Sequence, residues 1–174
     1  MTKKLFRFAL ILSMSGTLSQ AVDYKKLSDA LVVSLPLAAL GATLWLDDRE
    51  GTREFALAMG TDLLVTGGLK YTIPATRPDG GPHSFPSGHT SVAFTSAAFV
   101  HKRYGWRYAL PMYALSTLTA YSRVRARKHY LRDVAAGALL WTGIGYLMTK
   151  RFRGVAVRPG TSRGALGVTL TKRW

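Results

Sequence analysis

The chain has 174 residues, 48% of them hydrophobic, and it contains no cysteine. This length predicts one domain with a substantial core, and the lack of cysteine excludes disulfides, thiol catalysis and cysteine-based metal sites. The formal net charge is +15, and Asp133 is the only acid after residue 100. The basic half indicates an anionic partner. Because its cations alternate with long apolar runs, we expect anionic lipid headgroups and no nucleic acid.

Residues 1–21 are predicted to be a signal peptide or an uncleaved N-terminal anchor. Three basic residues among the first seven precede an apolar stretch at 8–18, and Ser19 and Ala21 fit a cleavage site after residue 21. In either form the following chain emerges on the far side of a membrane.

Between residues 22 and 153 the sequence predicts an all-α bundle of about five to six helices. Five predominantly apolar runs are expected to form helix centres: Ala30–Leu46, Phe55–Leu69, Thr90–Val100, Tyr108–Ser122 and Val134–Thr149. A spanning helix needs about 20 residues, so each run alone is marginal, and we expect the helices to extend into flanking polar sequence. A membrane-spanning bundle is favoured over a soluble, membrane-associated one. Asp62 within the second run is expected to face the bundle.

The placement of charge predicts an orientation for such a bundle. If the chain starts outside, successive crossings put 47–54, 101–107 and 150 onward inside, and the last two are strongly basic, as the positive-inside rule expects. Segments 70–89 and 123–133 then share the outer face. Residues 154–174 read as two short β runs around a glycine-rich turn, which predicts a basic C-terminal hairpin or tail.

The two outer segments contain three clusters of reactive residues: KYTIPATRP at 70–78, FPSGHT at 85–90 and SRVRARKHYLRD at 122–133. Phosphoryl transfer needs fixed cations and backbone N–H donors around the phosphate oxygens, a nucleophile, and a proton donor for the leaving oxygen. The clusters supply candidates for each of these roles: the cations Lys70, Arg77 and Arg123, the histidines His89 and His129, the carboxylate of Asp133, and the turn at Ser87 and Gly88. They therefore predict a site that holds a phosphate and breaks its ester bond.

Local spacing supports this interpretation. His129 and Asp133 are four residues apart, so on one helix they would share a face and the carboxylate would orient the imidazole. Ser87 and Gly88 follow a proline and precede an apolar run, so they are predicted to begin a helix whose free N–H groups favour an anion.

The pattern formed by K-x6-RP, PSGH and SR-x5-H-x3-D resembles that of the type 2 phosphatidic acid phosphatase (PAP2) superfamily. This superfamily also includes bacterial class A acid phosphatases and vanadium haloperoxidases, and the bacterial membrane lipid phosphatases are the branch that this chain resembles. The match extends from Lys70 to Asp133, with every defining position filled.

The resemblance implies a role for each matched residue. His129 would be the nucleophile that becomes phosphohistidine, Asp133 would orient it, and His89 would be the general acid. The phosphate would be bound by five residues: Lys70, Arg77, Ser87, Gly88 and Arg123. No metal and no other cofactor is implied. The gap between the first two clusters, DGGPHSF at 79–85, is shorter than expected, which leaves little chain for a lid.

The expected protein is thus a metal-independent phosphatase in a bacterial inner membrane, with its active site facing the periplasm. Its partner would be a lipid phosphate or pyrophosphate: phosphatidic acid, phosphatidylglycerophosphate, undecaprenyl pyrophosphate or lipid A. Two alternatives stay open, a soluble periplasmic acid phosphatase of class A type and a non-catalytic membrane protein that binds anionic lipid. The sequence does not indicate an oligomeric state.

Overall fold

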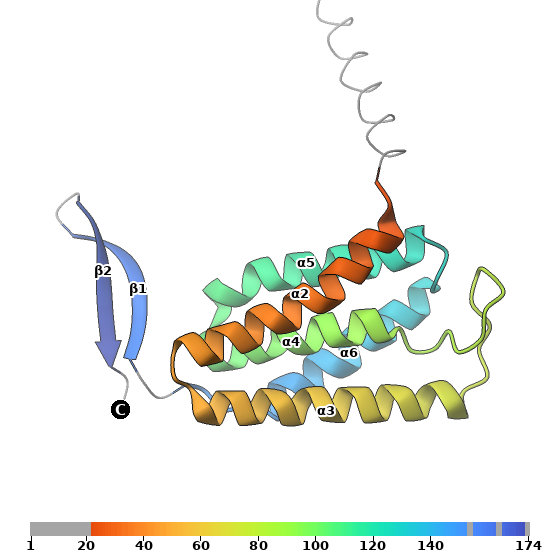
Figure 1. Cartoon of the computed structure of the whole chain (residues 1–174), viewed down its shortest axis with the longest axis horizontal. Coiled ribbons are helices and arrows are strands. Elements are labelled where there is room, and N and C mark those ends of the chain that lie inside the picture. The colour runs from red at the N-terminus through yellow and green to blue at the C-terminus, as the bar shows by residue number, and fades with distance from the viewer. Residues whose placement is uncertain (1–21, 153–154, 163–164, 173–174) are drawn as a thin grey trace, which may run out of the picture.

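The computed structural model describes residues 22–152, 155–162 and 165–172, and this part of the chain forms five helices and one hairpin (Figure 1). The helices are α2 (Tyr24–Trp45), α3 (Arg49–Thr72), α4 (Gly88–Tyr104), α5 (Trp106–Arg125) and α6 (Leu131–Leu147). Strands β1 (Val155–Ser162) and β2 (Ala165–Lys172) pair antiparallel, with Val155 opposite Lys172. The predicted all-α bundle with a short β tail is confirmed. The prediction for residues 1–21 lies outside the described residues.

Each predicted run lies mostly within one observed helix, and each helix extends beyond its run at one or both ends. The first and last runs continue slightly past their helices, which end at Trp45 and Leu147. Polar residues begin two of them: Asp23 accepts a hydrogen bond from the Lys26 N–H (3.0 Å), and Asp48 accepts one from Gly51 (2.9 Å). Such N-caps satisfy free N–H groups in the first turn. Gly105, with a φ of 104°, makes the sharp turn from α4 to α5.

Helix α4 lies at the centre of the bundle and packs against α2, α3, α5 and α6 (Figure 1). Small residues allow the close approach of α6. A Cβ atom on Gly145 would lie 3.1 Å from the Ala98 Cβ, and one on Gly137 would lie 3.1 Å from the Ser87 carbonyl oxygen. Gly137 therefore lets α6 approach the start of α4, and Gly145 lets it approach the middle of α4.

The helices place all three reactive clusters at one end of the bundle, called here the site end. It comprises the starts of α2, α4 and α6 and the ends of α3 and α5, and the loops 73–87 and 126–130 cover it (Figure 1). The turns from α2 to α3 and from α4 to α5 lie at the opposite, far end. The predicted gathering of the clusters on one face is confirmed, whereas the side of a membrane that this face meets stays a prediction.

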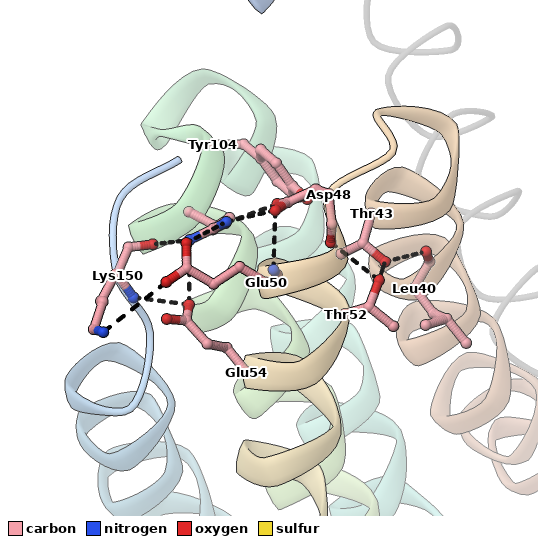
Figure 2. Close-up of polar contacts among 10 residues, drawn as sticks. Leu40, Thr43, Asp48, Glu50, Thr52, Glu54, Tyr104 and Lys150 are labelled. Atoms are coloured by element: carbon pink, nitrogen blue, oxygen red, sulfur yellow. Dashed lines mark hydrogen bonds and ion pairs between the residues drawn. The ribbon is translucent and has the colours of Figure 1, made fainter. Parts of the chain in front are cut away.

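The far end is held by a buried arginine. Arg103 is 2% exposed and donates hydrogen bonds to three carboxylates, those of Asp48, Glu50 and Glu54. It also donates to the Lys150 carbonyl oxygen at 3.1 Å. Figure 2 shows these acids and Lys150 converging from the turn before α3, from α3 itself and from the chain after α6. The cluster therefore joins three segments of the fold.

The outer surface of the bundle is apolar. Exposed leucines occur along the outer helices, such as Leu37 on α2, Leu64 on α3 and Leu139 on α6. Exposed aromatic residues flank them at the site end (Tyr71, Tyr121, Tyr130) and at the far end (Trp45, Trp106, Tyr146). By length and composition alone, one described helix, α2, is able to cross a membrane. Asp62 is fully buried and accepts hydrogen bonds from Thr66 and Thr95, so it faces the bundle as predicted.

Candidate active site

Hydrogen bonds join the second and third clusters, and they connect the loop between the first two clusters to both Lys70 and Asp133. The Lys70 Nζ donates to the His83 carbonyl oxygen at 2.9 Å, which ties the end of α3 to the following loop. The Ser84 hydroxyl donates to Asp133 Oδ2 at 2.5 Å, and the Ser87 N–H donates to the Asp133 carbonyl oxygen at 3.1 Å. Residues nearly fifty positions apart thus form one site around the start of α6.

His129 and Asp133 are in contact, although not by the geometry that the sequence suggested. Helix α6 begins at Leu131, so His129 precedes it, and the expectation that both residues share a helix face is wrong. The contact arises from the N-terminal turn, where Asp133 Oδ2 accepts the Tyr130 N–H at 2.9 Å. The same oxygen lies 3.7 Å from His129 Nδ1, which is an ion-pair distance and too long for a hydrogen bond.

The environment of His129 keeps its ring uncharged. The side chain is 2% exposed, and no residue in the described part of the chain gives its Nδ1 a hydrogen-bond partner. Burial, followed by the positive charges of Arg123, Lys70 and Arg77, lowers the pKa of His129 to about 3. A neutral imidazole has a free lone pair at neutral pH, which is the state that a nucleophile requires.

The three predicted cations lie near one another and are incompletely satisfied. Burial and the charges of Arg77 and Arg123 lower the pKa of Lys70 to about 8, with the Asp133 charge opposing them. The Nε atoms of Arg77 and Arg123 are buried without a hydrogen-bond partner among the described residues. Buried N–H groups are normally paired, so these two donors are candidates to bind an anion.

The start of α4 adds backbone donors. Ser87 occupies the N-cap position and Gly88 is the first helical residue, as predicted. The Ser87 side chain makes no capping hydrogen bond to the helix backbone; its hydroxyl oxygen instead accepts one from the Thr90 hydroxyl at 3.1 Å. A Cβ on Gly88 would make only ordinary contacts, the nearest with Lys70 Cε at 3.7 Å. Packing within the protein therefore does not require glycine here.

His89 has a partner that the sequence did not reveal. Its Nε2 lies 2.9 Å from Asp29 Oδ1 on α2, and the same oxygen receives Arg123 NH1 at 3.2 Å. Burial, then the charge of Arg123, lowers the pKa of His89, and Asp29 acts in the opposite direction. In the sequence, Asp29 could be recognised only as an acid near the predicted outer face on the first helix, and nothing indicated that His89 would be its partner.

Two further contacts at the site end were not predicted from the sequence. Ser84, which is fully buried against Asp133, lies outside the three motifs. Asp79 on the loop after α3 pairs with Lys128 on the loop before α6, with the Lys128 Nζ 2.6 Å from Asp79 Oδ2. Within the described part of the chain, no group of three or more His, Asp or Glu side chains is arranged to hold a metal ion.

The sequence profile of the PAP2 superfamily matches residues 51–155, which include every predicted site residue. The chain belongs to the PAP2 superfamily. It is 36% identical to a lipid A 4'-phosphatase of Helicobacter pylori over 131 residues, covering 68% of this chain and 66% of that protein. It is also 38% identical to a lipid A 1-phosphatase of Porphyromonas gingivalis over 82 residues, which cover 45% of this chain and 18% of that protein.

Two solved PAP2-like folds resemble the bundle. Aquifex aeolicus LpxE superposes with a TM-score of 0.56 at 22% identity, covering 69% of this chain and 84% of LpxE. A transmembrane PAP2-type phosphatidylglycerolphosphate phosphatase from Bacillus subtilis superposes with a TM-score of 0.54 at 23% identity, covering 83% of this chain and 92% of that protein. At these identities the likeness establishes the fold of this PAP2 protein and leaves its substrate to other arguments.

Proposed function

We propose that this PAP2 protein is a phosphatase that removes phosphate from a membrane lipid through a phosphohistidine at His129. The observation that carries the proposal is the surrounding of His129: a buried, neutral imidazole among Lys70, Arg77 and Arg123. Cations placed around a nucleophile stabilise the charge of a transferring phosphoryl group, and here they take the role that a metal ion has in other phosphatases.

The proposed reaction has two steps. Asp133 lies near Nδ1 of His129, so Nε2 is the nitrogen that attacks phosphorus. As the bond from phosphorus to the lipid oxygen breaks, His89 donates a proton to that oxygen. In the second step a water molecule gives a proton to His89 while its oxygen bonds to phosphorus and the bond to His129 breaks. Phosphate leaves, and both histidines return to their initial states.

The phosphate itself would be bound by both charges and backbone donors. The unpartnered Nε atoms of Arg77 and Arg123 and the ammonium of Lys70 would bind its oxygens. The Ser87 hydroxyl and the N–H of Gly88 at the start of α4 would add neutral donors, aided by the helix dipole. This set matches the three equatorial oxygens of the transition state.

Among lipid phosphates, lipid A is the substrate class that we favour. Two relatives that match this chain at 36% and 38% identity are named lipid A phosphatases, one acting at the 4' position and one at the 1 position. A third, 31% identical over 85 residues, is a probable diacylglycerol pyrophosphate phosphatase of Schizosaccharomyces pombe. Phosphatidic acid, phosphatidylglycerophosphate and undecaprenyl pyrophosphate are therefore the comparison substrates for an assay.

The proposed location is the bacterial inner membrane, with the site end at its periplasmic surface. Exposed leucines between two sets of exposed aromatic residues are the pattern expected of a bundle that crosses a bilayer. Helix α2 has 22 residues, which is about 33 Å of helix and enough for a hydrocarbon core of about 30 Å. Because α2 begins at the site end, an N-terminal signal or anchor would deliver that end to the periplasm. This apolar surface disfavours the alternative of a soluble acid phosphatase.

The test is phosphate release by protein purified in detergent, in the presence of EDTA, from lipid A and the comparison substrates. His129→Ala is expected to lower kcat by at least about 10²–10⁴-fold, because it removes the attacking atom. His101→Phe is the matched control, since the His101 ring contacts Trp106 edge-to-face at the far end and a phenylalanine ring can keep that contact. A phosphoenzyme that survives base and is lost in acid would identify the intermediate.

Two results would contradict the proposal. Turnover by His129→Ala at the wild-type rate would exclude the phosphohistidine. Lipid binding by the wild type without any phosphate release would favour the non-catalytic alternative, a basic membrane protein that only binds anionic lipid.

A further inference from the structure

Asp29 on α2 joins two site residues that belong to other helices. Its Oδ1 lies 2.9 Å from Nε2 of His89 on α4 and 3.2 Å from NH1 of Arg123 on α5. Its Oδ2 accepts from the Lys25 Nζ at 3.3 Å, so both carboxylate oxygens are occupied. Asp29 precedes residue 51, where the match to the PAP2 profile begins, and none of the three motifs contains it.

We propose that Asp29 is a positioning residue that fixes the ring of His89 so that its Nδ1 gives and takes the transferred proton. This inference rests on the proposed function, because it concerns His89 as the proton donor. Asp29 does not touch the reacting atoms and acts only through His89. Burial raises the pKa of Asp29, but its contacts with His89 and Lys25 outweigh burial and lower that pKa, so the carboxylate is ionised at neutral pH. Arg123 contacts the same carboxylate oxygen as His89.

The chemistry follows from the occupied ring nitrogen. When His89 is protonated, Nε2–H donates to Asp29 and Nδ1–H is available to the leaving oxygen. After that proton has moved, the neutral ring keeps its remaining proton on Nε2, where the carboxylate accepts it. Nδ1 is then unprotonated and ready to take a proton from water. A ring without Asp29 would populate both tautomers, and one of them is unable to act as this base.

Besides orienting the His89 ring, Asp29 affects its protonation through its negative charge. Four charged groups act on this ring and its partner: Arg123 from α5, Arg77 from the loop after α3, and Asp29 and Lys25 from α2. The two arginines lower the pKa of His89, whereas Asp29 raises it. Removal of the Asp29 charge should therefore lower the pKa of His89 further and leave less of the protonated acid at neutral pH.

The experiment compares Asp29→Asn with Asp23→Asn. Asp23 caps the start of the same helix through the Lys26 N–H, and asparagine caps equally well. The control therefore removes one carboxylate from the same end of α2 while keeping the helix start intact. Each variant is assayed for kcat/KM with two substrates, a short-chain phosphatidic acid and p-nitrophenyl phosphate. The alkoxide of the first needs a proton to leave, whereas p-nitrophenolate leaves without one.

Asp29→Asn is expected to lower kcat/KM for the phosphatidic acid by roughly tenfold or more, and by much less for p-nitrophenyl phosphate. The alkaline limb of its pH profile should also move to lower pH, whereas Asp23→Asn should behave as the wild type. Equal losses on both substrates with an unmoved alkaline limb would assign Asp29 a purely structural role and overturn the inference.

A second measurement does not depend on turnover. The chain has four histidines, so ¹⁵N-histidine NMR with a His89→Gln reference identifies the His89 ring. The wild-type ring should carry its proton on Nε2 when neutral and should titrate at a higher pH than in Asp29→Asn. An unchanged tautomer and titration in the variant would overturn the pairing. If the wild type releases no phosphate while the NMR difference is present, the proposed function fails and the pairing stands.

Discussion

The two ends of the bundle each bury an arginine, and they treat it differently. At the far end, every guanidinium nitrogen of Arg103 donates a hydrogen bond, and three carboxylates surround it (Figure 2). At the site end, Arg123 is 4% exposed and its Nε has no partner among the described residues. Within the described part of the chain it contacts one carboxylate, that of Asp29, which is shared with His89.

The difference is the one expected between an arginine that holds the fold and an arginine with the proposed role of binding phosphate. A buried charge is tolerated when its partners replace the water that it has lost. Arg103 has such partners, so it contributes to the joining of the turn before α3, α3 and the chain after α6. Among the described residues, Arg123, Arg77 and Lys70 lie close enough for their charges to act on one another, and the Nε atoms of both arginines have no partner. The site end therefore concentrates positive charge, which is the arrangement that the proposed phosphate site requires.

The largest expected effect comes from exchanging these arginines for methionine. Arg103→Met leaves the buried carboxylates of Asp48 and Glu54 without their cation, which is expected to cost about 3–5 kcal/mol of stability. Arg123→Met leaves Asp29 still paired with His89 and Lys25, so the stability should change far less. Its kcat/KM should instead fall by about 10²–10³-fold, because a donor to the transition state is lost.

Denaturation in detergent measures the stability of both variants, and phosphate release per folded molecule measures their activity. The two variants should therefore show opposite effects. Arg103→Met should unfold more easily and keep its kcat/KM, whereas Arg123→Met should stay folded and have a reduced kcat/KM. Equal losses of stability in both variants would contradict the distinction between the two ends.

Sequence analysis predicted much of the fold because its signals are local. Uncharged runs indicated each helix, and the alternation of the loops placed the three clusters on one face. The start of α4 at Ser87 and Gly88 followed from a proline, a capping residue and the apolar run after them. These features depend on residues a few positions apart.

What the sequence did not reveal depends on packing between distant residues. Asp29 and His89 are 60 positions apart, and Arg103 and Asp48 are 55 apart. Nothing in the basic segment 101–107 distinguishes the buried Arg103 from its neighbours, so its carboxylate cluster was not predicted. For His129 and Asp133 the spacing indicated the right pair and the wrong geometry, because α6 begins between them.

A smaller effect should appear in the pH dependence of stability. In the folded protein, burial and the nearby cations hold the pKa of His129 at about 3, whereas in the unfolded chain it is about 6.5. Between these values the unfolded chain binds the extra proton, so stability should fall as the pH decreases from about 6.5, by up to about 1.4 kcal/mol per pH unit for this one group. Above pH 7 both states are neutral, and His129 should add no slope.

His129→Asn removes this titration. Chemical denaturation from pH 4.5 to 8 should give the variant a shallower acid limb than the wild type, with parallel curves above pH 7 as the internal control. An identical acid limb in the two proteins would show that the cations at the site end do not act on this ring.

The smallest effect is expected from the Lys128–Asp79 pair, which lies at the site end but near its surface. Both side chains retain more than a quarter of their exposure, so water and salt screen their attraction. A double-mutant cycle of Lys128→Gln and Asp79→Asn should give a small coupling energy that declines as salt is added. A coupling as large as that of a buried ion pair, and insensitive to salt, would mean that the two loops hold the site end as firmly as Arg103 holds the far end. A small value would instead leave both loops free to adjust to a lipid headgroup, because the rigid parts of the site lie on the ends of the helices.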